Sequence, residues 1–166
     1  MDKFLNALGD CVDGQLNLYR KLLDLFHAER SAILASDLEE LNRIIMDKEM
    51  LLQSIRNAEV ARRTIADKLA AELGIDTGEM TISRLADMVP DPQASRIQDK
   101  GARLKDLIGE IQVASERNRS LCLHALQFVS GSIKRLSALT RPNKVYHASG
   151  RIPNDKNIGR MLSGAV

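Results

Sequence analysis

Few side chains in this 166-residue sequence have the types and spacing that catalysis or metal binding requires. A di-iron centre in a helical bundle needs two Glu-x-x-His pairs with further inward-facing carboxylates. The nearest match is Asp24-x-x-His27, and the sequence holds no second copy of it. Phosphotransfer through His27 or His124 is a further possibility, but neither residue is followed by the Lys-Gly pair usual in such domains. We therefore expect a protein that binds partners, with no catalytic residue, no metal and no other cofactor.

Composition indicates an all-α fold in the cytoplasm. Aromatic residues make up 3% of the sequence, with no Trp, whereas sheets favour aromatic and β-branched residues. Cys11 and Cys122 lie far apart in predicted helices, which favours reduced, buried thiols over a disulfide. Acidic and basic residues are interspersed without a basic stripe, so no nucleic-acid partner is expected. The start lacks the apolar core of a signal peptide, and no apolar run reaches the roughly 18 residues of a membrane span, so direct membrane insertion is not expected.

Hydrophobic spacing predicts three long helices packed as an elongated antiparallel bundle or coiled coil. The first covers about residues 3 to 35, the second about 37 to 73, and the third begins at Pro92 and ends at Thr140. Ser36 and Glu39 match the S-x-x-E capping box, which places a tight hairpin between the first two helices. At about 1.5 Å per residue, each helix would be roughly 50 to 70 Å long.

The connection to the third helix contains its own start and stop signals. Gly74 is expected to end the second helix in a left-handed turn. A short helix is expected over 83–89, and Asp91 is the expected cap of the third helix, with Pro92 in its first turn.

The predicted contact faces contain polar residues whose roles the sequence leaves open. The stripe expected on the second helix comprises Leu38, Leu41, Ile45, Leu52, Ile55, Ala66, Leu69 and Leu73. Lys48, Glu59 and Arg62 interrupt it, and we expect their stems to cover the bundle edge with the charges in water. On the third helix, Ser115 and Asn118 either form a polar layer in the core that fixes register, or Asn118 faces water. Met46 and Met50 either fill the core or form a pliable binding surface.

The last segment, 141–166, has a different composition and is expected to be a flexible partner-binding tail on a bundle domain of residues 1–140. It has several basic residues, one acid at Asp155, and Pro and Gly residues that prevent continuous helix. The apolar residues Ile158, Met161, Leu162 and Val166 are spaced as on one face of a helix that could form against a partner. Tyr146 is either an anchor for a partner or packs back onto the bundle.

Taken together, these features resemble the FlgN family of flagellar type III export chaperones. The resemblance covers nearly the whole chain. It rests on Ala35-Ser36-Asp37-Leu38-Glu39-Glu40-Leu41, Lys48-Glu49-x-Leu51-Leu52, Asn118-x-x-Leu121 and Val145-Tyr146-x-Ala148-x-Gly150-Arg151. The family often has a second Asn three or four residues before the one matched by Asn118, where this sequence has Ala114 and Ser115.

The resemblance implies a cytoplasmic, nonenzymatic chaperone. Its substrates would be hook-filament junction proteins, whose terminal helices it would hold and deliver to the export gate at the membrane. Substrate binding is expected at the end of the third helix and in the tail, with Ile158, Met161, Leu162 and Val166 contacting the substrate helix. Tyr146 is expected to dock onto the cytoplasmic domain of the gate.

Two alternatives stay open beside the chaperone. The first is a structural coiled-coil adaptor that oligomerises through the heptad pattern of the third helix. The second is a phosphotransfer protein built on a helical bundle. A chaperone of this kind is expected to be a monomer or a weak homodimer, whereas the adaptor is expected to be a stable dimer or trimer.

Overall fold

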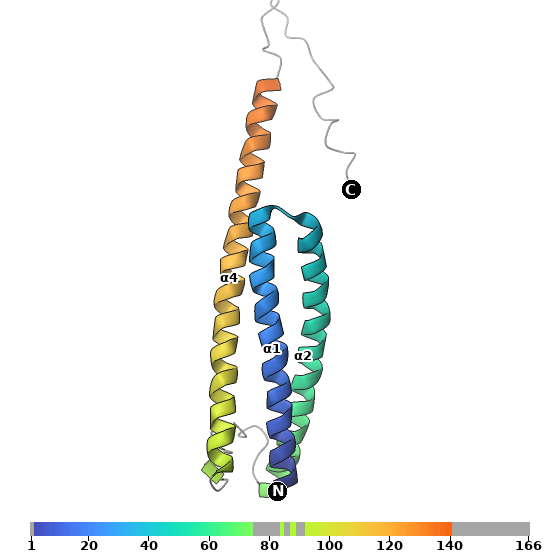
Figure 1. Cartoon of the computed structure of the whole chain (residues 1–166), viewed down its shortest axis with the longest axis vertical. Coiled ribbons are helices and arrows are strands. Elements are labelled where there is room, and N and C mark those ends of the chain that lie inside the picture. Colours follow the sequence, from blue (N-terminus) through green and yellow to red (C-terminus); the bar gives the residue numbers. More distant parts are fainter. Residues whose placement is uncertain (1, 75–83, 85–86, 89–91, 141–166) are drawn as a thin grey trace, which may run out of the picture. The chain divides into compact units, whose positions relative to one another are not determined.

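The computed structural model describes residues 2–74, 84, 87–88 and 92–140, and within them the fold is all-α (Figure 1). The long helices are α1 (Asp2–Ala35), α2 (Leu38–Leu73) and α4 (Gln93–Thr140), and the described residues include no strand. The predicted fold class is confirmed. Four helices were expected, and the described residues include the three long ones. Of the expected short helix, residues 84, 87 and 88 are described, and they are helical. Asp91, the expected cap of the third helix, lies outside the described residues.

The chain divides into two compact units, Met1–His124 and Ala125–Val166, and the boundary between them falls within α4. Every described residue that is buried lies between Leu5 and Asn118, so the core belongs to the first unit. The expected division between a bundle domain and a tail at Thr140 stays a prediction.

The hairpin between α1 and α2 differs in its capping from the sequence prediction. Ser36 has a positive φ of 56°, and the N–H groups of Ser36 and Asp37 donate to the carbonyls of Ile33 and Ala32. This pair of hydrogen bonds is the Schellman arrangement that closes a helix, so Ser36 ends α1 and does not cap α2. Asp37 is the N-cap instead, and its side chain accepts a hydrogen bond from Glu40 N at 3.0 Å. The predicted Ser36–Glu39 capping box is therefore wrong by one residue.

The core of the first unit consists of two apolar clusters, each built from all three helices. One cluster contains Leu5, Leu8, Leu69 and Ile97. The other contains Val12, Leu16, Leu22, Ile55, Leu107 and Ile111. Because α1, α2 and α4 each contribute to both clusters, the first unit is a three-helix bundle. Lys100 of α4 donates a hydrogen bond to the carbonyl of Gly9 in α1, and Asn118, further along α4, donates to the carbonyl of Phe26, further along α1. The two helices therefore run in the same direction.

The buried face of α2 includes part of the predicted stripe, since Ile55 and Leu69 are buried and Leu41, Ala66 and Leu73 are half-buried. Its inward residues alternate at spacings of four and three, and all are buried or half-buried: Ile44, Lys48, Leu51, Ile55, Ala58, Arg62, Ile65 and Leu69. Leu38, Ile45 and Leu52, which were expected to face inward, are 72%, 42% and 37% exposed. The prediction considered apolar residues alone, whereas the residues of α2 that face inward include the cations Lys48 and Arg62. Met46 and Met50 are also exposed, so they do not fill the core.

Candidate functional site

A buried polar layer joins the three helices of the first unit. Asn118 of α4 is 4% exposed, and its Nδ2 donates to the carbonyl oxygen of Phe26 at 2.7 Å and to Oε2 of Glu29 at 2.9 Å. Glu29 of α1 also accepts from Lys48 Nζ of α2, at 3.0 and 2.9 Å to its two carboxylate oxygens. The side chains of Lys48 and Glu29 are only 16% and 13% exposed. The predicted placement of the Lys48 charge in water is therefore wrong.

Lys48 and Glu29 can lie inside the bundle because each has several partners. Lys48 Nζ lies 4.0 Å from the centroid of the Phe26 ring, whose negative face attracts a cation. A buried charge is tolerated when it is paired and hydrogen-bonded, and both conditions hold here. Asn118 thus faces the core and not water, and Ser115, about one turn earlier on α4, is half-buried. That these two residues fix the register of the helices stays a prediction.

A second polar group lies between α1 and α2, about four turns along α1 from the first. Gln15 is completely buried, and its Nε2 donates to Oε2 of Glu59 at 2.7 Å. Hydrogen bonds from Arg62, and then from Gln15, hold the pKa of Glu59 below its ordinary value. Burial raises the pKa of the Cys11 thiol and of the Tyr19 hydroxyl nearby. Cys11 is therefore a protonated donor, to Ala58 O at 3.6 Å, and both cysteines of the chain are free.

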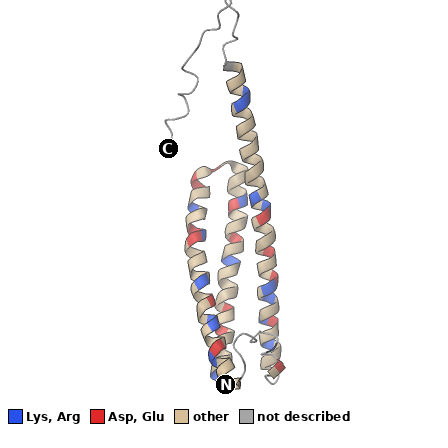
Figure 2. Cartoon of the chain, turned by 180° about the vertical axis from the view of Figure 1, so that it is seen from behind, with Lys and Arg blue, Asp and Glu red and all other residues tan. Residues whose placement is uncertain are grey.

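The end of α4 presents an apolar face in the unit that begins at Ala125. We call this surface the α4 apolar face and define it by four residues spaced three and four apart, with exposed fractions of 50 to 63%: Leu126, Val129, Ile133 and Leu136. Lys134 and Arg135 are the only charged residues between 125 and 140. Figure 2 shows the change from mixed charges along most of α4 to this sparsely charged end. Exposed apolar patches that exceed a few hundred Å² are typical of interaction surfaces, so this stripe is a candidate for one.

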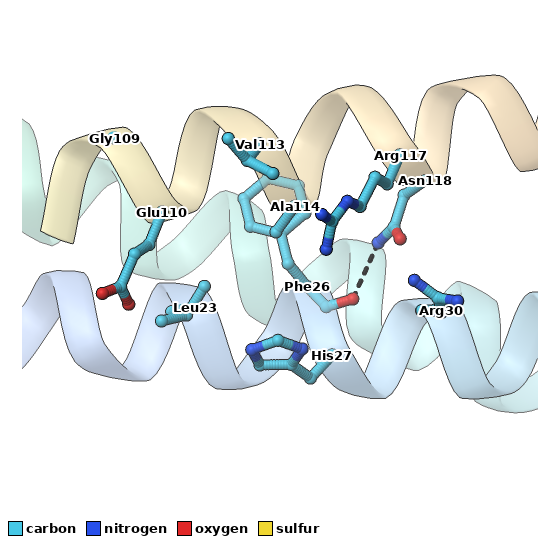
Figure 3. Close-up of a pocket in the computed structure, with 10 residues that line it drawn as sticks. All are labelled: Leu23, Phe26, His27, Arg30, Gly109, Glu110, Val113, Ala114, Arg117 and Asn118. Carbon is cyan, nitrogen blue, oxygen red and sulfur yellow. Dashed lines mark hydrogen bonds between the residues drawn. The ribbon is translucent and has the colours of Figure 1, made fainter.

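A groove of about 400 Å³ lies between α1 and α4 of the first unit (Figure 3). Leu23 and Phe26 of α1 and Val113 and Ala114 of α4 provide its apolar surface. Glu110 lies toward one end of the groove, and Arg30 and Arg117 lie toward the other. The sequence reading missed this groove, because its residues come from positions about 90 apart that no local pattern links.

All five residues predicted to bind partners belong to the last segment of the chain. Tyr146 and the four apolar tail residues, Ile158, Met161, Leu162 and Val166, lie outside the described residues. Glu29, Lys48 and Gln15 were not expected as core residues. The sequence does contain a signal for them. Each lies three or four residues from the apolar core residues of its helix, so a heptad count that admits polar residues would have included it.

Within the described parts of the chain, no group of three or more His, Cys, Asp or Glu side chains is arranged to hold a metal ion. None of the described helices is both long and apolar enough to cross a membrane.

Comparison with protein-family models gives a match over most of the chain. The family model described as FlgN protein matches residues 1–154, which include the three-helix bundle, the α4 apolar face and Tyr146. Neither a curated protein nor a solved structure gives a significant match. The family is one of flagellar export chaperones and not of enzymes, and the all-α bundle with its exposed apolar face is consistent with such a role. Because the matched model covers most of the sequence, the chain belongs to the FlgN family.

Proposed function

We propose that this protein is a cytoplasmic chaperone for flagellar hook-filament junction proteins. It binds their terminal helices, prevents premature assembly and delivers them to the type III export gate. The observation that carries the proposal is the α4 apolar face, an exposed helical stripe within the part of the chain that matches the family. A substrate helix that must be kept from assembling has an apolar face of its own, and the two faces could pack against each other.

The size of the α4 apolar face suggests that it does not act alone. Burying one Leu, Ile or Val side chain stabilises a complex by about 1.5 to 3 kcal/mol. Association costs on the order of 4 to 15 kcal/mol in lost freedom of motion. Four such side chains therefore give weak binding, and micromolar affinity requires further apolar contacts. We propose that Ile158, Met161, Leu162 and Val166 supply them from the tail.

The family match covers only one of the two parts of the proposed substrate site, which are the α4 apolar face and the apolar residues of the tail. The α4 apolar face lies within the matched residues, whereas Ile158 and the residues after it follow the end of the match at residue 154. Tyr146 lies within the match, and we propose that it docks onto the cytoplasmic domain of the export gate.

Calorimetric titration with the C-terminal helical fragment of a junction protein tests this assignment. Ile133→Asp places a charge in the α4 apolar face and is expected to weaken binding at least tenfold. Gln127→Asp places the same charge on the other side of α4 and is the matched control. Equal affinity of the two variants would remove the α4 apolar face from the substrate site.

The tail is tested separately with the same fragment. Met161→Asp combined with Leu162→Asp should weaken substrate binding without changing the circular dichroism spectrum. Tyr146→Ala should leave substrate binding unchanged and weaken binding to the cytoplasmic domain of the gate. If Tyr146→Ala also abolishes substrate binding, the tyrosine serves the substrate.

A coiled-coil adaptor is the second candidate function, and the same apolar face of α4 favours it. An adaptor would use this face to bind further copies of the chain. Light scattering at micromolar concentration distinguishes the two functions, because a stable dimer or trimer that Ile133→Asp dissociates would support the adaptor.

A further inference from the structure

The groove between α1 and α4 combines an apolar floor with an uneven distribution of charge. Phe26 and Leu23 are half-buried at its floor, and Val113 remains half exposed on the α4 side. Gly109 lines the groove, and a Cβ atom at this position would meet nothing within 4 Å. The space beside the α4 backbone at Gly109 is therefore open.

The charges along the groove are unpaired within the described part of the chain. Arg30 and Arg117 approach the same end from α1 and α4, and His27 lies between them and the middle of the groove (Figure 3). Neither arginine forms an ion pair with a described residue, whereas Glu40, Glu59 and Glu29 all pair with cations elsewhere in the bundle. Glu110 lies seven residues before Arg117, about two helical turns or roughly 10 Å away. One end of the groove is thus basic, and the other contains a single acid.

We propose that this groove binds an amphipathic helix of a partner protein, with its apolar stripe on Phe26 and Val113 and acidic side chains facing Arg30 and Arg117. A helix suits the site because the groove follows two parallel helices, and a third helix packed along them buries a continuous apolar stripe. Two arginines at the rim recognise carboxylates with directed hydrogen bonds and steer the approach of an acidic partner.

The tail of this chain does not have the charge that the groove favours. Between residues 141 and 166 it has Arg141, Lys144, Arg151, Lys156 and Arg160 but one acid, Asp155. Placing such a segment beside Arg30 and Arg117 would bring like charges together. The site also consists of residues other than those of the α4 apolar face, so it does not rest on the proposed substrate site.

Two synthetic 18-residue helical peptides test the proposal by fluorescence anisotropy on the full chain. Both have the same leucine stripe, and its flanking positions are glutamate in one peptide and lysine in the other. The glutamate peptide is expected to bind more tightly. Arg30→Glu combined with Arg117→Glu should weaken that binding by roughly tenfold or more, because it replaces two attractions with two repulsions. The same variant should bind the lysine peptide more tightly than the unchanged chain does.

Two further variants separate the groove from general electrostatic attraction. Arg56→Glu with Arg63→Glu makes the same change of net charge at exposed positions of α2, and it should leave the affinity for the glutamate peptide nearly unchanged. Gly109→Leu should fill the groove and weaken binding of both peptides, while the circular dichroism spectrum stays helical.

Several results would overturn the proposal. One is the absence of glutamate-peptide binding by the unchanged chain, and another is an equal loss of affinity in the two charge-reversal variants. Loss of peptide binding in Ile133→Asp but not in Gly109→Leu would place the peptide on the α4 apolar face. A dimer that Arg30→Glu with Arg117→Glu dissociates would make a second copy of the chain the occupant.

Discussion

The polar residues inside the bundle are arranged so that each charge has a partner on another helix or on the next turn. Lys48, Glu29 and Asn118 connect α2, α1 and α4 through hydrogen bonds of 2.7 to 3.0 Å. A buried ion pair adds little net stability over an apolar pair, but leaving one of its charges without the other is costly. We therefore predict that the layer contributes less to net stability than to excluding helix alignments in which the charges would be unpaired.

Removing one charge of this layer is expected to destabilise the bundle more than removing both. Lys48→Met should lower the free energy of unfolding by about 3 kcal/mol, because Glu29 is then left nearly buried without its cation. Lys48→Met combined with Glu29→Met should recover much of that loss. Urea unfolding followed by circular dichroism measures both values. Arg43→Met, in the exposed pair with Glu40, is the control and should change stability little. A double variant that is less stable than Lys48→Met would contradict this account.

Glu59 gives the bundle a pH dependence whose sign follows from its partners. Its pKa is lowered in the folded state, chiefly by the hydrogen bond from Arg62. The ionised form therefore stabilises the fold at pH values above the unfolded pKa of about 4.3. This contribution is lost as the pH falls through the folded pKa, because the carboxylate is then protonated in both states.

Glu59→Gln should accordingly be less stable than the unchanged chain at neutral pH, and the difference should shrink in acid. Urea unfolding at a series of pH values from 7 to 3 measures it. Glu39→Gln, at an exposed position in the first turn of α2, is the control. A difference that stays constant from pH 7 to pH 3 would show that Glu59 acts through packing and not through its charge.

At the scale of elements, the sequence predicted the helices well and the orientation of α2 less well. The ends of α1, α2 and α4 lie within two residues of those expected, because Gly74 and Pro92 are strong boundary signals. Gly74 has φ 68°, and its N–H donates to the carbonyls of Ala70 and Ala71, as a helix-ending glycine does. The α2 face was partly misassigned because Lys48 and Arg62 occupy core positions. The acidic partner of Lys48 is Glu29 of α1, whereas that of Arg62 is Glu59, one turn earlier on α2 itself.

In the turn between α1 and α2, substitutions at two neighbouring residues are expected to have different effects on the free energy of unfolding. Asp37→Ala removes the cap of α2 and should lower the free energy of unfolding by about 1 kcal/mol. Ser36→Gly should leave stability unchanged or raise it, because glycine adopts a positive φ without the steric cost that serine has. If Ser36 were the cap instead, Ser36→Gly would be the more damaging of the two in thermal unfolding.

At the scale of the whole molecule, the chain combines a closed core with two surfaces of different chemistry. The described core lies between Leu5 and Asn118. The groove between α1 and α4 has two arginines at its rim that form no ion pair with a described residue, and the α4 apolar face has few charges. The sequence indicated the heptad of α4 that contains the apolar face. It could not show that this part of α4 is exposed, because a heptad pattern looks the same on a covered helix face and on an uncovered one. Nor could it indicate the groove, whose two sides come from distant helices.

The most direct test of the chaperone proposal is calorimetric titration of a junction-protein helical fragment into the full chain and into a chain that ends at His124. The shorter chain lacks the α4 apolar face and the tail but keeps every described buried residue, so its bundle should still unfold cooperatively. We expect micromolar or tighter binding by the full chain and none by the shorter one. Binding of equal strength to both would place the substrate site on the bundle, and no binding to either would contradict the proposed function.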